Sequence, residues 1–448
     1  MIKERKNLVK TLEEFEKNGV YNWFLYNNYS MWPAIKVYIS HKETNTLRKK
    51  YVAGNKLGFI LKSISIFFIS LFNIVWVSLF VREKHICFGS FVGLIQHDKR
   101  YIDSLIPEGH NYNVHILNCG HISHFFPNIK YVIKNKCIVD NYFFGIISKI
   151  IMPLLKNRFK PYHENCTKLK DQLHACGIEI TQRELLIVIK RYISLYIIYR
   201  FTLKILNPKK ALLISAYTKT SHCAALKDLL LEIIEAQHGL IGPQTPGYNY
   251  ANLKSVNNIK IPIPDKVLVY NDFWKKELLA SNYLQESDVS IVGNKKIDLV
   301  MNKSNNPYKK KSYILFTGQG INMKEISDFL FDLCNSILSL NSNLHVLYRP
   351  HPKEDPKDYE IITNILCYHS NFSIIDNREI STEKLIADSA IHISYNSACH
   401  FDAIHLLGKT YFLDPGDANF MEYYANKYGT KKFVKITNIN DILNPILE

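Results

Sequence analysis

Arg349 and His351 stand directly after a short apolar run, residues 344–348, which predicts a buried strand. A guanidinium fork beside an imidazole is a pair of groups that binds phosphate or another anion. Pro350 and Pro352 stiffen the loop, so less entropy is lost when a ligand orders it. A proline-stiffened turn with a solvent-exposed histidine would leave the same pattern. Arg349, His351 and Pro352 are therefore candidate phosphate-binding residues.

Hydroxyl and amide side chains follow a second apolar run, residues 390–393. Ser394, Asn396 and Ser397 stand between that run and a helical pattern at 397–407. Ser397 is predicted as the N-cap of this helix, whose free N–H groups and positive dipole end would then bind phosphate. Ordinary capping by serine is the simpler alternative. We take Ser394, Asn396 and Ser397 as candidate nucleotide-binding residues.

A short glycine motif follows a third apolar run, residues 312–317. Gly318, Gln319 and Gly320 lead from it into a helical pattern at 323–340. Glycines let a backbone approach a ligand closely because they have no Cβ. A tight turn also favours glycine, so the motif alone does not distinguish contact with a ligand from a simple turn. We include all three residues among the nucleotide-binding candidates.

A candidate proton acceptor lies earlier in the chain. Residues 232–236 predict a strand that contains Glu235 and runs into His238, and a loop rich in proline and glycine follows at 243–248. A carboxylate or an imidazole at a strand end can accept a proton from a substrate hydroxyl. A histidine hydrogen-bonded within a turn is the alternative. Glu235, His238 and His351 are the candidate catalytic residues.

The spacing of apolar residues predicts the elements that position these groups. From residue 312 onward, short apolar runs alternate with helical patterns, which is typical of a parallel sheet with helices on both faces. Nucleotides bind such sheets at the carboxyl ends of the strands. The predicted strands are 312–317, 344–348, 372–375, 390–393 and 410–413, with helices at 323–340, after Pro356, from Thr382 and at 397–407.

The preceding part of the chain repeats this alternation less regularly. We therefore predict an α/β fold with two Rossmann-like domains that face a cleft, and extra helices at the N-terminus. The polar stretch at 302–311 marks the expected boundary. The predicted regions are a helical segment at 1–84, an acceptor domain at 85–305 and a nucleotide-donor domain at 306–448. Expected strands include 85–91, 114–117, 211–216, 266–270 and 289–292, with helices at 143–155, 184–205, 221–231 and 272–280.

The net charge indicates which partners to expect, and the cysteine spacing indicates the compartment. The formal net charge is +16, which favours phosphate-bearing substrates or anionic lipids. Basic residues are spread along the chain and no zinc-finger, RNA-binding or basic-zipper signature occurs, so we expect no nucleic-acid partner. The nine cysteines have no C-x-x-C spacing, which argues against a disulfide framework or a zinc site and favours a reducing, cytoplasmic compartment.

An uncharged apolar run at 63–81 is long enough to cross a bilayer, which takes about 20 residues. Serine and asparagine interrupt it, and basic residues flank both ends, so the flanks give no orientation. Only three residues then separate it from a predicted strand. Three alternatives stay open: a span, a helix that lies on an anionic membrane surface, and an ordinary buried helix.

The order of the motifs resembles one group of enzymes. Gln237-His238-Gly239 at a strand end, Arg349-Pro-His-Pro352, and Ser394-x-x-Ser397 followed by Phe401-Asp402 occur in this order. This resembles the GT-B glycosyltransferases of bacterial capsule, lipopolysaccharide and teichoic-acid synthesis. Those enzymes include H-P-motif sialyltransferases, Kdo transferases and CDP-glycerol glycerophosphotransferases. The resemblance extends over about residues 211–415.

The resemblance implies roles for particular residues. His351, Ser394 and Ser397 would bind the nucleotide phosphate, with Arg349 assisting. The base that we expect from the residues themselves is Glu235 or His238. The acidic-acidic-Gly motif of the sialyltransferases is not reproduced at 235–239, which leaves the donor sugar open. We expect inverting transfer from a CMP-sugar, without a cofactor. We expect this transfer to be metal-independent, since no D-x-D motif occurs.

The expected acceptor is lipid-linked or an oligosaccharide. The expected location is the inner face of the cytoplasmic membrane, where an anionic lipid surface is a further partner. The alternatives are a CDP-linked polyol-phosphate transferase and a non-catalytic membrane-surface scaffold of polysaccharide export.

Overall fold

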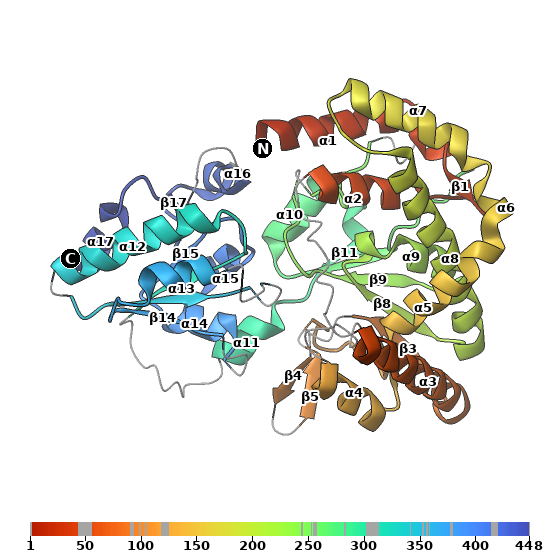
Figure 1. Cartoon of the computed structure of the whole chain (residues 1–448), viewed down its shortest axis with the longest axis horizontal. Helices are drawn as coiled ribbons and strands as arrows, with labels where there is room; N and C mark the ends of the chain where they lie inside the picture. Colours follow the sequence, from red (N-terminus) through yellow and green to blue (C-terminus); the bar gives the residue numbers. More distant parts are fainter. Residues whose placement is uncertain are drawn as a thin grey trace. The chain divides into compact units, whose positions relative to one another are not determined.

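The computed structural model divides the chain into two compact units, residues 5–295 and 296–448, each built on one parallel sheet (Figure 1). It describes residues 2–447 except 44–55, 90–93, 98–99, 104, 118–124, 243–244, 252, 254–257, 282–283, 302–312, 341, 352–353, 355–356, 358, 377–379 and 414–419. The expected boundary at 302–311 lies outside the described residues. The domain limits at 84 and 305 stay predictions.

Seven parallel strands form the sheet of the N-terminal unit, in the order β11-β10-β9-β8-β3-β6-β7. Their side chains are apolar on both faces, as a sheet covered by helices on both sides requires. The order runs outward in both directions from β3 and β8. The strands are β3 (His85–Phe88), β6 (Val114–Leu117), β7 (Ile138–Asp140), β8 (Lys210–Ile214), β9 (Ile233–Ala236), β10 (Lys266–Val269) and β11 (Val289–Ile291).

The 25-residue helix α8 (Gln182–Leu206) is defined at both ends by its sequence. Thr181 and Glu184 form a capping box at its start, and Asn207 ends it in the left-handed conformation. The predicted helix at 143–155 is the helix α5 (Asn141–Ile151) followed by a 3-10 turn, η4 (Met152–Leu155). The other helices are α4 (Phe125–Lys134), α6 (Lys156–Phe159), α7 (Tyr162–Ala175), α9 (Thr220–Lys227) and α10 (Asp272–Ala280).

The first eighty residues belong to this unit from residue 5 onward. They form α1 (Ile2–Lys17), α2 (Trp32–Glu43) and α3 (Lys56–Phe80), with a small hairpin of β1 (Leu25–Tyr26) and β2 (Tyr29–Ser30) between α1 and α2. Asn27 and Asn28 both have positive φ, the conformation that a two-residue type I′ turn needs. A second hairpin consists of β4 (Leu94–His97) and β5 (Arg100–Asp103). Neither hairpin was expected from the sequence.

Six parallel strands form the sheet of the C-terminal unit, in the order β14-β13-β12-β15-β16-β17. This arrangement confirms the alternation predicted from the sequence. The strands are β12 (Tyr313–Thr317), β13 (His345–Arg349), β14 (Phe372–Ile374), β15 (Ile391–Ser394), β16 (Thr410–Phe412) and β17 (Phe433–Lys435).

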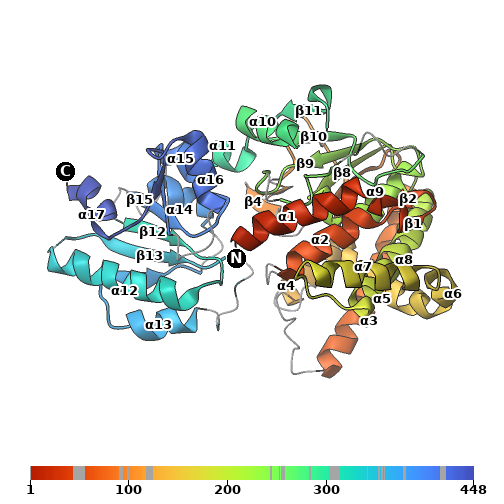
Figure 2. The same cartoon turned by 90° about the horizontal axis from the view of Figure 1, so that it is seen from above.

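Helices cover both faces of the second sheet, as Figure 2 shows. On one face, α12 and α13 pack against Phe316, Val346 and Ile393. On the other face, α14 and α15 pack against Leu315 and Leu347. Both domains are therefore Rossmann-like. The helices are α11 (Lys295–Met301), α12 (Met323–Ser339), α13 (Glu360–Leu366), α14 (Thr382–Asp388), α15 (Cys399–Leu407), α16 (Phe420–Tyr428) and α17 (Asn440–Leu447).

Candidate functional site

The carboxyl ends of β12, β13 and β15 lie side by side in the C-terminal unit. Thr317 at the end of β12 is in register with Arg349 on one side and with Ser394 on the other. The strand order runs outward from β12 and β15, and such a reversal is where an open parallel sheet leaves a crevice for a ligand. The three loops predicted to bind a nucleotide therefore begin at this edge.

Gln319 joins the loop after β12 to the loop after β15. Its side-chain amide donates to the backbone carbonyl of Asn396, and its carbonyl accepts the Asn396 N–H at 3.3 Å. The Ser394 hydroxyl adds a bond of 2.7 Å to the backbone carbonyl of Thr317. We call this set of contacts the Gln319 clasp. Two motifs that lie 77 residues apart in the sequence thus form one hydrogen-bonded structure.

Packing and backbone geometry explain the two glycines of this loop. A Cβ on Gly318 would lie 2.0 Å from the hydroxyl oxygen of Tyr348, which is far inside contact distance. Gly320 has a φ of +65°, the left-handed conformation that favours glycine. Both glycines therefore shape the loop, and contact between a nucleotide and either of them stays a prediction.

Arg349 uses two of its donors inside the protein. Its guanidinium Nη1 donates to the carbonyl of Ile375 at 2.9 Å, and its Nη2 donates to the carbonyl of Ile380 at 3.0 Å. The side chain is buried. Arg349 therefore holds the segment between β14 and α14, and a phosphate contact by Arg349 stays a prediction.

His351 is exposed at the end of the same strand. Its backbone N–H donates to the Glu354 carboxylate at 2.7 Å, which fixes the start of the loop. Pro352 lies outside the described residues. The exposed imidazole is accessible to a ligand, but this exposure also fits the proline-stiffened turn that the sequence left open, so phosphate binding by His351 stays a prediction.

The helix after β15 begins later than predicted. Its N-cap is Ala398 rather than Ser397, and α15 starts at Cys399. The prediction of Ser397 as N-cap was therefore wrong by one residue, because the chain makes a bend at 395–396 before the first helical turn. The Ser397 hydroxyl still accepts the N–H of Cys399 at 3.2 Å, so it satisfies one free donor of this helix start.

A buried hydrogen-bond chain next to these strand ends was not predicted. The imidazole of His392 bonds Thr317 at 3.0 Å and Thr410 at 2.8 Å, and Thr410 bonds His400 at 2.8 Å. Burial lowers the pKa of His392 and lowers the pKa of His400 to about 4, so both rings are neutral at pH 7. This hydrogen-bond chain links the end of β12 to β15 and to the start of β16. Its only sequence signal is a histidine inside an apolar strand.

A second group that the sequence did not reveal contains Lys296, Glu383 and Asp402. Lys296 and Glu383 form an ion pair at 3.5 Å. Burial, together with the Glu383 charge, raises the pKa of Asp402 to about 7, and Lys296 opposes this shift. Asp402 lies in the first turn of α15, so this group borders the crevice. Its members come from α11, α14 and α15, which no local pattern connects.

In the N-terminal unit, Glu235 lies on β9 beside the loop that follows β8. Its Oε1 accepts the N–H of Ala216 and the hydroxyl of Tyr248, each at 2.8 Å, while its Oε2 is buried without a partner among the described residues. Burial raises the pKa of Glu235 to about 7. Because the side chain has no exposed surface, Glu235 holds the loops around it rather than facing solvent.

His238 differs from Glu235 in its exposure. It is exposed two residues after the end of β9, and the backbone before it is fixed by Gln237. The Gln237 side chain accepts the N–H of Tyr270 at 3.0 Å, and the Tyr270 hydroxyl donates to the Gln237 carbonyl at 2.8 Å. His238 is thus an accessible imidazole on a rigid segment.

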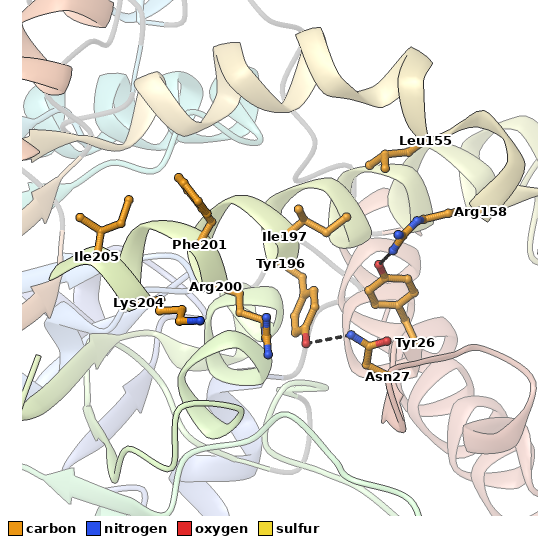
Figure 3. Close-up of a pocket in the computed structure, with 10 residues that line it drawn as sticks. All are labelled: Tyr26, Asn27, Leu155, Arg158, Tyr196, Ile197, Arg200, Phe201, Lys204 and Ile205. Carbon is orange, nitrogen blue, oxygen red and sulfur yellow. Dashed lines mark hydrogen bonds between the residues drawn. The ribbon is translucent and has the colours of Figure 1, made fainter. Parts of the chain in front are cut away.

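A separate hollow of about 740 Å³ lies between β1, η4, α6 and α8 (Figure 3). Arg158, Arg200 and Lys204 contribute positive charge, and Leu155 and Phe201 contribute apolar surface. Arg200 is paired with Asp228 at 3.0 Å. None of the residues predicted from the motifs lines this hollow.

Comparisons with known proteins give no family. No protein-family model matches the chain, and no curated protein matches it. Among solved structures, it is similar to the UDP-GlcNAc 2-epimerase from Methanocaldococcus jannaschii, with 11% identity, a TM-score of 0.40, and coverage of 58% of this chain and 75% of that chain.

Two further structures match over more of the chain. The S. aureus MnaA structure with UDP has 11% identity, a TM-score of 0.47, and coverage of 82% of this chain and 88% of that chain. The glycotransferase of kitacinnamycin has 8% identity, a TM-score of 0.42, and coverage of 82% and 90%. Likeness at this level establishes no activity, so the function must be argued from the chain's own residues.

Proposed function

We propose that the chain is a GT-B glycosyltransferase that moves a sugar from a nucleotide donor to a growing surface glycan. One observation carries the proposal: the Gln319 clasp lies where the strand order of the C-terminal sheet reverses. Crevices at such reversals bind nucleotides in open parallel sheets. The C-terminal unit is the donor domain in this proposal.

The donor phosphates bind at the start of α15 and at His351. The free N–H groups and the positive dipole end of the nine-residue helix α15 attract phosphate, and the exposed imidazole adds a donor. Gln319 and Asn396 contact the nucleotide, while Ser394 and Arg349 hold the loops in place. Donors placed in advance stabilise the charge that develops on the leaving nucleotide.

His238 is the base in this proposal, and Glu235 positions the loops around it. The imidazole removes the proton from the acceptor hydroxyl, the hydroxyl oxygen bonds to the anomeric carbon, and the bond from that carbon to the phosphate oxygen breaks. The nucleotide leaves with the negative charge. Of the two residues that the sequence offered as base, His238 is supported by its exposure, whereas Glu235 is completely buried.

The donor we favour is a CMP-sugar such as sialic acid or Kdo, and the acceptor is a lipid-linked or oligosaccharide chain of a capsule or O-antigen. The enzyme works at the inner face of the cytoplasmic membrane and needs neither a metal nor a cofactor. A CDP-linked polyol-phosphate transferase is the alternative with the same crevice. A non-catalytic export scaffold would bind membranes and no nucleotide.

Thermal unfolding of the full chain with a nucleotide panel tests the proposal. CMP-, CDP-, UDP- and GDP-sugars and CDP-glycerol are added one at a time at saturating concentration. A ligand at about 100 times its Kd stabilises a protein by about 2.7 kcal/mol, so the true donor raises Tm measurably. Stabilisation by CDP-glycerol alone would favour the polyol-phosphate transferase. A panel in which no nucleotide changes Tm would overturn the proposal.

Gln319→Ala locates the binding site within the chain. Loss of the clasp frees both loops, so the donor that stabilises the wild type should bind this variant about tenfold more weakly. Gln285→Ala, in the other unit, serves as the matched control and should leave the nucleotide Kd unchanged. Equal Kd values for Gln319→Ala and the wild type would move the nucleotide site away from the crevice.

A further inference from the structure

Helix α3 is fixed to the N-terminal unit along one side. Asn73 donates to the backbone carbonyls of Val132 and Ile138, and Ser70 accepts the N–H of Asp140 at 3.2 Å. These bonds connect the polar residues of α3 to the edge strand β7 and to α4. Ser70 and Asn73, two of the polar residues that interrupt the apolar run, are therefore used inside the protein.

The opposite side of α3 exposes a continuous row of large apolar side chains. Successive members are three or four residues apart, which places them on one face of a helix. Their exposed fractions lie between 48% and 71%. We call this row the α3 stripe; it consists of Leu61, Ile64, Phe68, Phe72, Val75 and Leu79.

The stripe is too large and too regular for an ordinary soluble surface. The segment Leu61–Phe80 has a mean hydropathy of 2.1, yet only 28% of it is buried in the protein. Contiguous apolar patches of this kind mark a surface that binds another apolar phase. The length would also allow a span, but the bonds of Ser70 and Asn73 hold α3 against β7. A helix held in this way lies on a bilayer rather than across it.

Positive charge accompanies the stripe. Lys130, Lys134 and Lys136 are exposed on α4 and on the turn after it, and Lys149 is exposed on α5, the helix beside α3 (Figure 1). Neither α3 nor α4 contains an aspartate or glutamate. Cations beside an exposed apolar face are complementary to anionic phospholipid headgroups.

Trp76 adds a feature of membrane interfaces. The Lys136 ammonium lies 3.9 Å from the centroid of the Trp76 ring, and Phe80 packs on the same ring at 4.4 Å between centroids. An amphipathic indole next to a lysine is typical of the headgroup level, where the ring is half in the apolar phase.

We propose that the α3 stripe docks the protein on an anionic phospholipid bilayer, with the lysines of α4 and α5 at the lipid phosphates. The stripe enters the boundary between headgroups and acyl chains, and α3 lies parallel to the surface. This proposal does not depend on the proposed transferase activity, because it rests on residues outside both strand-end sites.

Co-sedimentation of the full chain with vesicles tests the docking. The vesicles are either pure phosphatidylcholine or phosphatidylcholine with 30% phosphatidylglycerol, a composition chosen to supply negative charge. We expect strong binding to the anionic vesicles and at least tenfold weaker binding to the neutral ones, since each lysine near an anionic surface contributes about fivefold. Recovery of the wild-type chain in the supernatant with anionic vesicles would overturn the proposal.

A triple variant identifies the surface involved. Leu61→Glu, Phe68→Glu and Leu79→Glu change exposed positions only, so the fold should persist, and binding to anionic vesicles should fall at least a hundredfold. The matched control makes the same charge change at exposed apolar residues elsewhere: Leu230→Glu, Met301→Glu and Tyr368→Glu. Circular dichroism verifies that both variants are folded. Equal loss of binding in the control would remove the stripe from the interface.

Three further measurements distinguish membrane docking from dimer formation through the stripe and from a membrane span. Brominated acyl chains should quench the fluorescence of Trp76 on binding, and Trp76→Phe should abolish that quenching. A chain that forms stable dimers through the stripe would sediment as a dimer without lipid, and the triple variant would be monomeric; that result contradicts membrane docking. Resistance to extraction by alkaline carbonate would contradict it in favour of a span.

Discussion

Glu235 and His238 are three residues apart, yet their surroundings give them different chemistry. The Glu235 carboxyl is enclosed and receives hydrogen bonds from Ala216 and Tyr248. His238 stands in solvent at the end of the same strand. A buried carboxyl loses the hydration that favours its charged form, so its pKa rises. Exposure rather than residue type therefore decides which of the two can reach an acceptor.

The raised pKa of Glu235 makes stability depend on pH. Its pKa is about 7 in the folded chain against 4.5 for an ordinary glutamate, so the folded state keeps the proton between these values. Stability is therefore lost as the pH rises from about 4.5 to 7. The loss is about 3 kcal/mol from this group. Glu235→Gln cannot ionise at this position. Urea unfolding between pH 5 and pH 8 should therefore show a loss of unfolding free energy that is smaller than the wild-type loss by about this amount.

The test compares how the unfolding free energy changes with pH, and not its value at a single pH. The reason is that the new amide of Glu235→Gln places an NH₂ group at the position of Oε2, which has no partner among the described residues, and this cost is the same at every pH. Glu179→Gln, at a largely exposed glutamate, is the control and should follow the wild-type pH dependence. If the unfolding free energy changes with pH by the same slope in Glu235→Gln and in the wild type, Glu235 is already ionised in the folded chain.

His351→Ala should lower turnover about a hundredfold or more while the unfolding free energy stays nearly unchanged. In the proposed function the exposed imidazole stabilises charge on the leaving phosphate, and an exposed side chain contributes little to the buried core. Steady-state kinetics with the donor found in the nucleotide panel measure the effect. His405→Ala, at an exposed histidine on α15 of the same unit, is the control. An unchanged kcat in His351→Ala would remove this residue from the site.

At the scale of elements, the N-terminal helices support the loop beside Glu235. Glu16 of α1 and Lys36 of α2 form a fully buried ion pair at 2.7 Å. Glu16 also accepts the indole N–H of Trp32 at 2.8 Å, and Lys36 donates to the carbonyl of Asn249. Asn249 follows Tyr248, whose hydroxyl binds Glu235. The two helices thus fix the segment that encloses Glu235.

Removal of one member of this pair should be costly. Lys36→Met leaves the Glu16 carboxylate buried without its cation, which typically costs about 3–5 kcal/mol of unfolding free energy. The double variant Glu16→Gln with Lys36→Met removes the uncompensated charge and should recover most of that loss. Urea unfolding of both variants provides the test. A single variant as stable as the wild type would show that the pair does not hold the helices.

At the scale of the whole molecule, two sheets of the same kind carry different groups at their carboxyl ends. The order of the first sheet reverses at β3 and β8, and that of the second reverses at β12 and β15. The first has a buried carboxyl and an exposed imidazole nearby, and the second has the Gln319 clasp and a helix start. In the proposed function, donor binding and acceptor activation belong to separate units and can be changed separately.

This division predicts that His238→Ala lowers kcat at least a hundredfold but leaves the nucleotide Kd within about twofold of the wild type. In the proposed function the nucleotide contacts lie in the other unit, so calorimetric titration should detect no change in donor binding. His174→Ala, at an exposed histidine of the same unit, controls for nonspecific effects. Loss of nucleotide affinity in His238→Ala equal to its loss in kcat would contradict separate roles.

The sequence by itself determined the class of fold, because apolar runs and helical periods are local properties that each segment carries alone. It also placed Gly318, Arg349 and Ser394 at strand ends, since these residues follow apolar runs directly. It located the start of α15 within two residues, although the N-cap was misassigned, because serine satisfies helix N–H groups from more than one position.

Only the tertiary structure decided what those residues do. Burial and partners come from segments far apart in the chain: Ile375 and Ile380 bind Arg349, Thr317 binds Ser394, and Tyr348 excludes a side chain at position 318. The group of Lys296, Glu383 and Asp402 and the exposed side of α3 arise in the same way. No local pattern encodes them, because hydrogen bonding and exposure depend on which surfaces meet after the chain has folded.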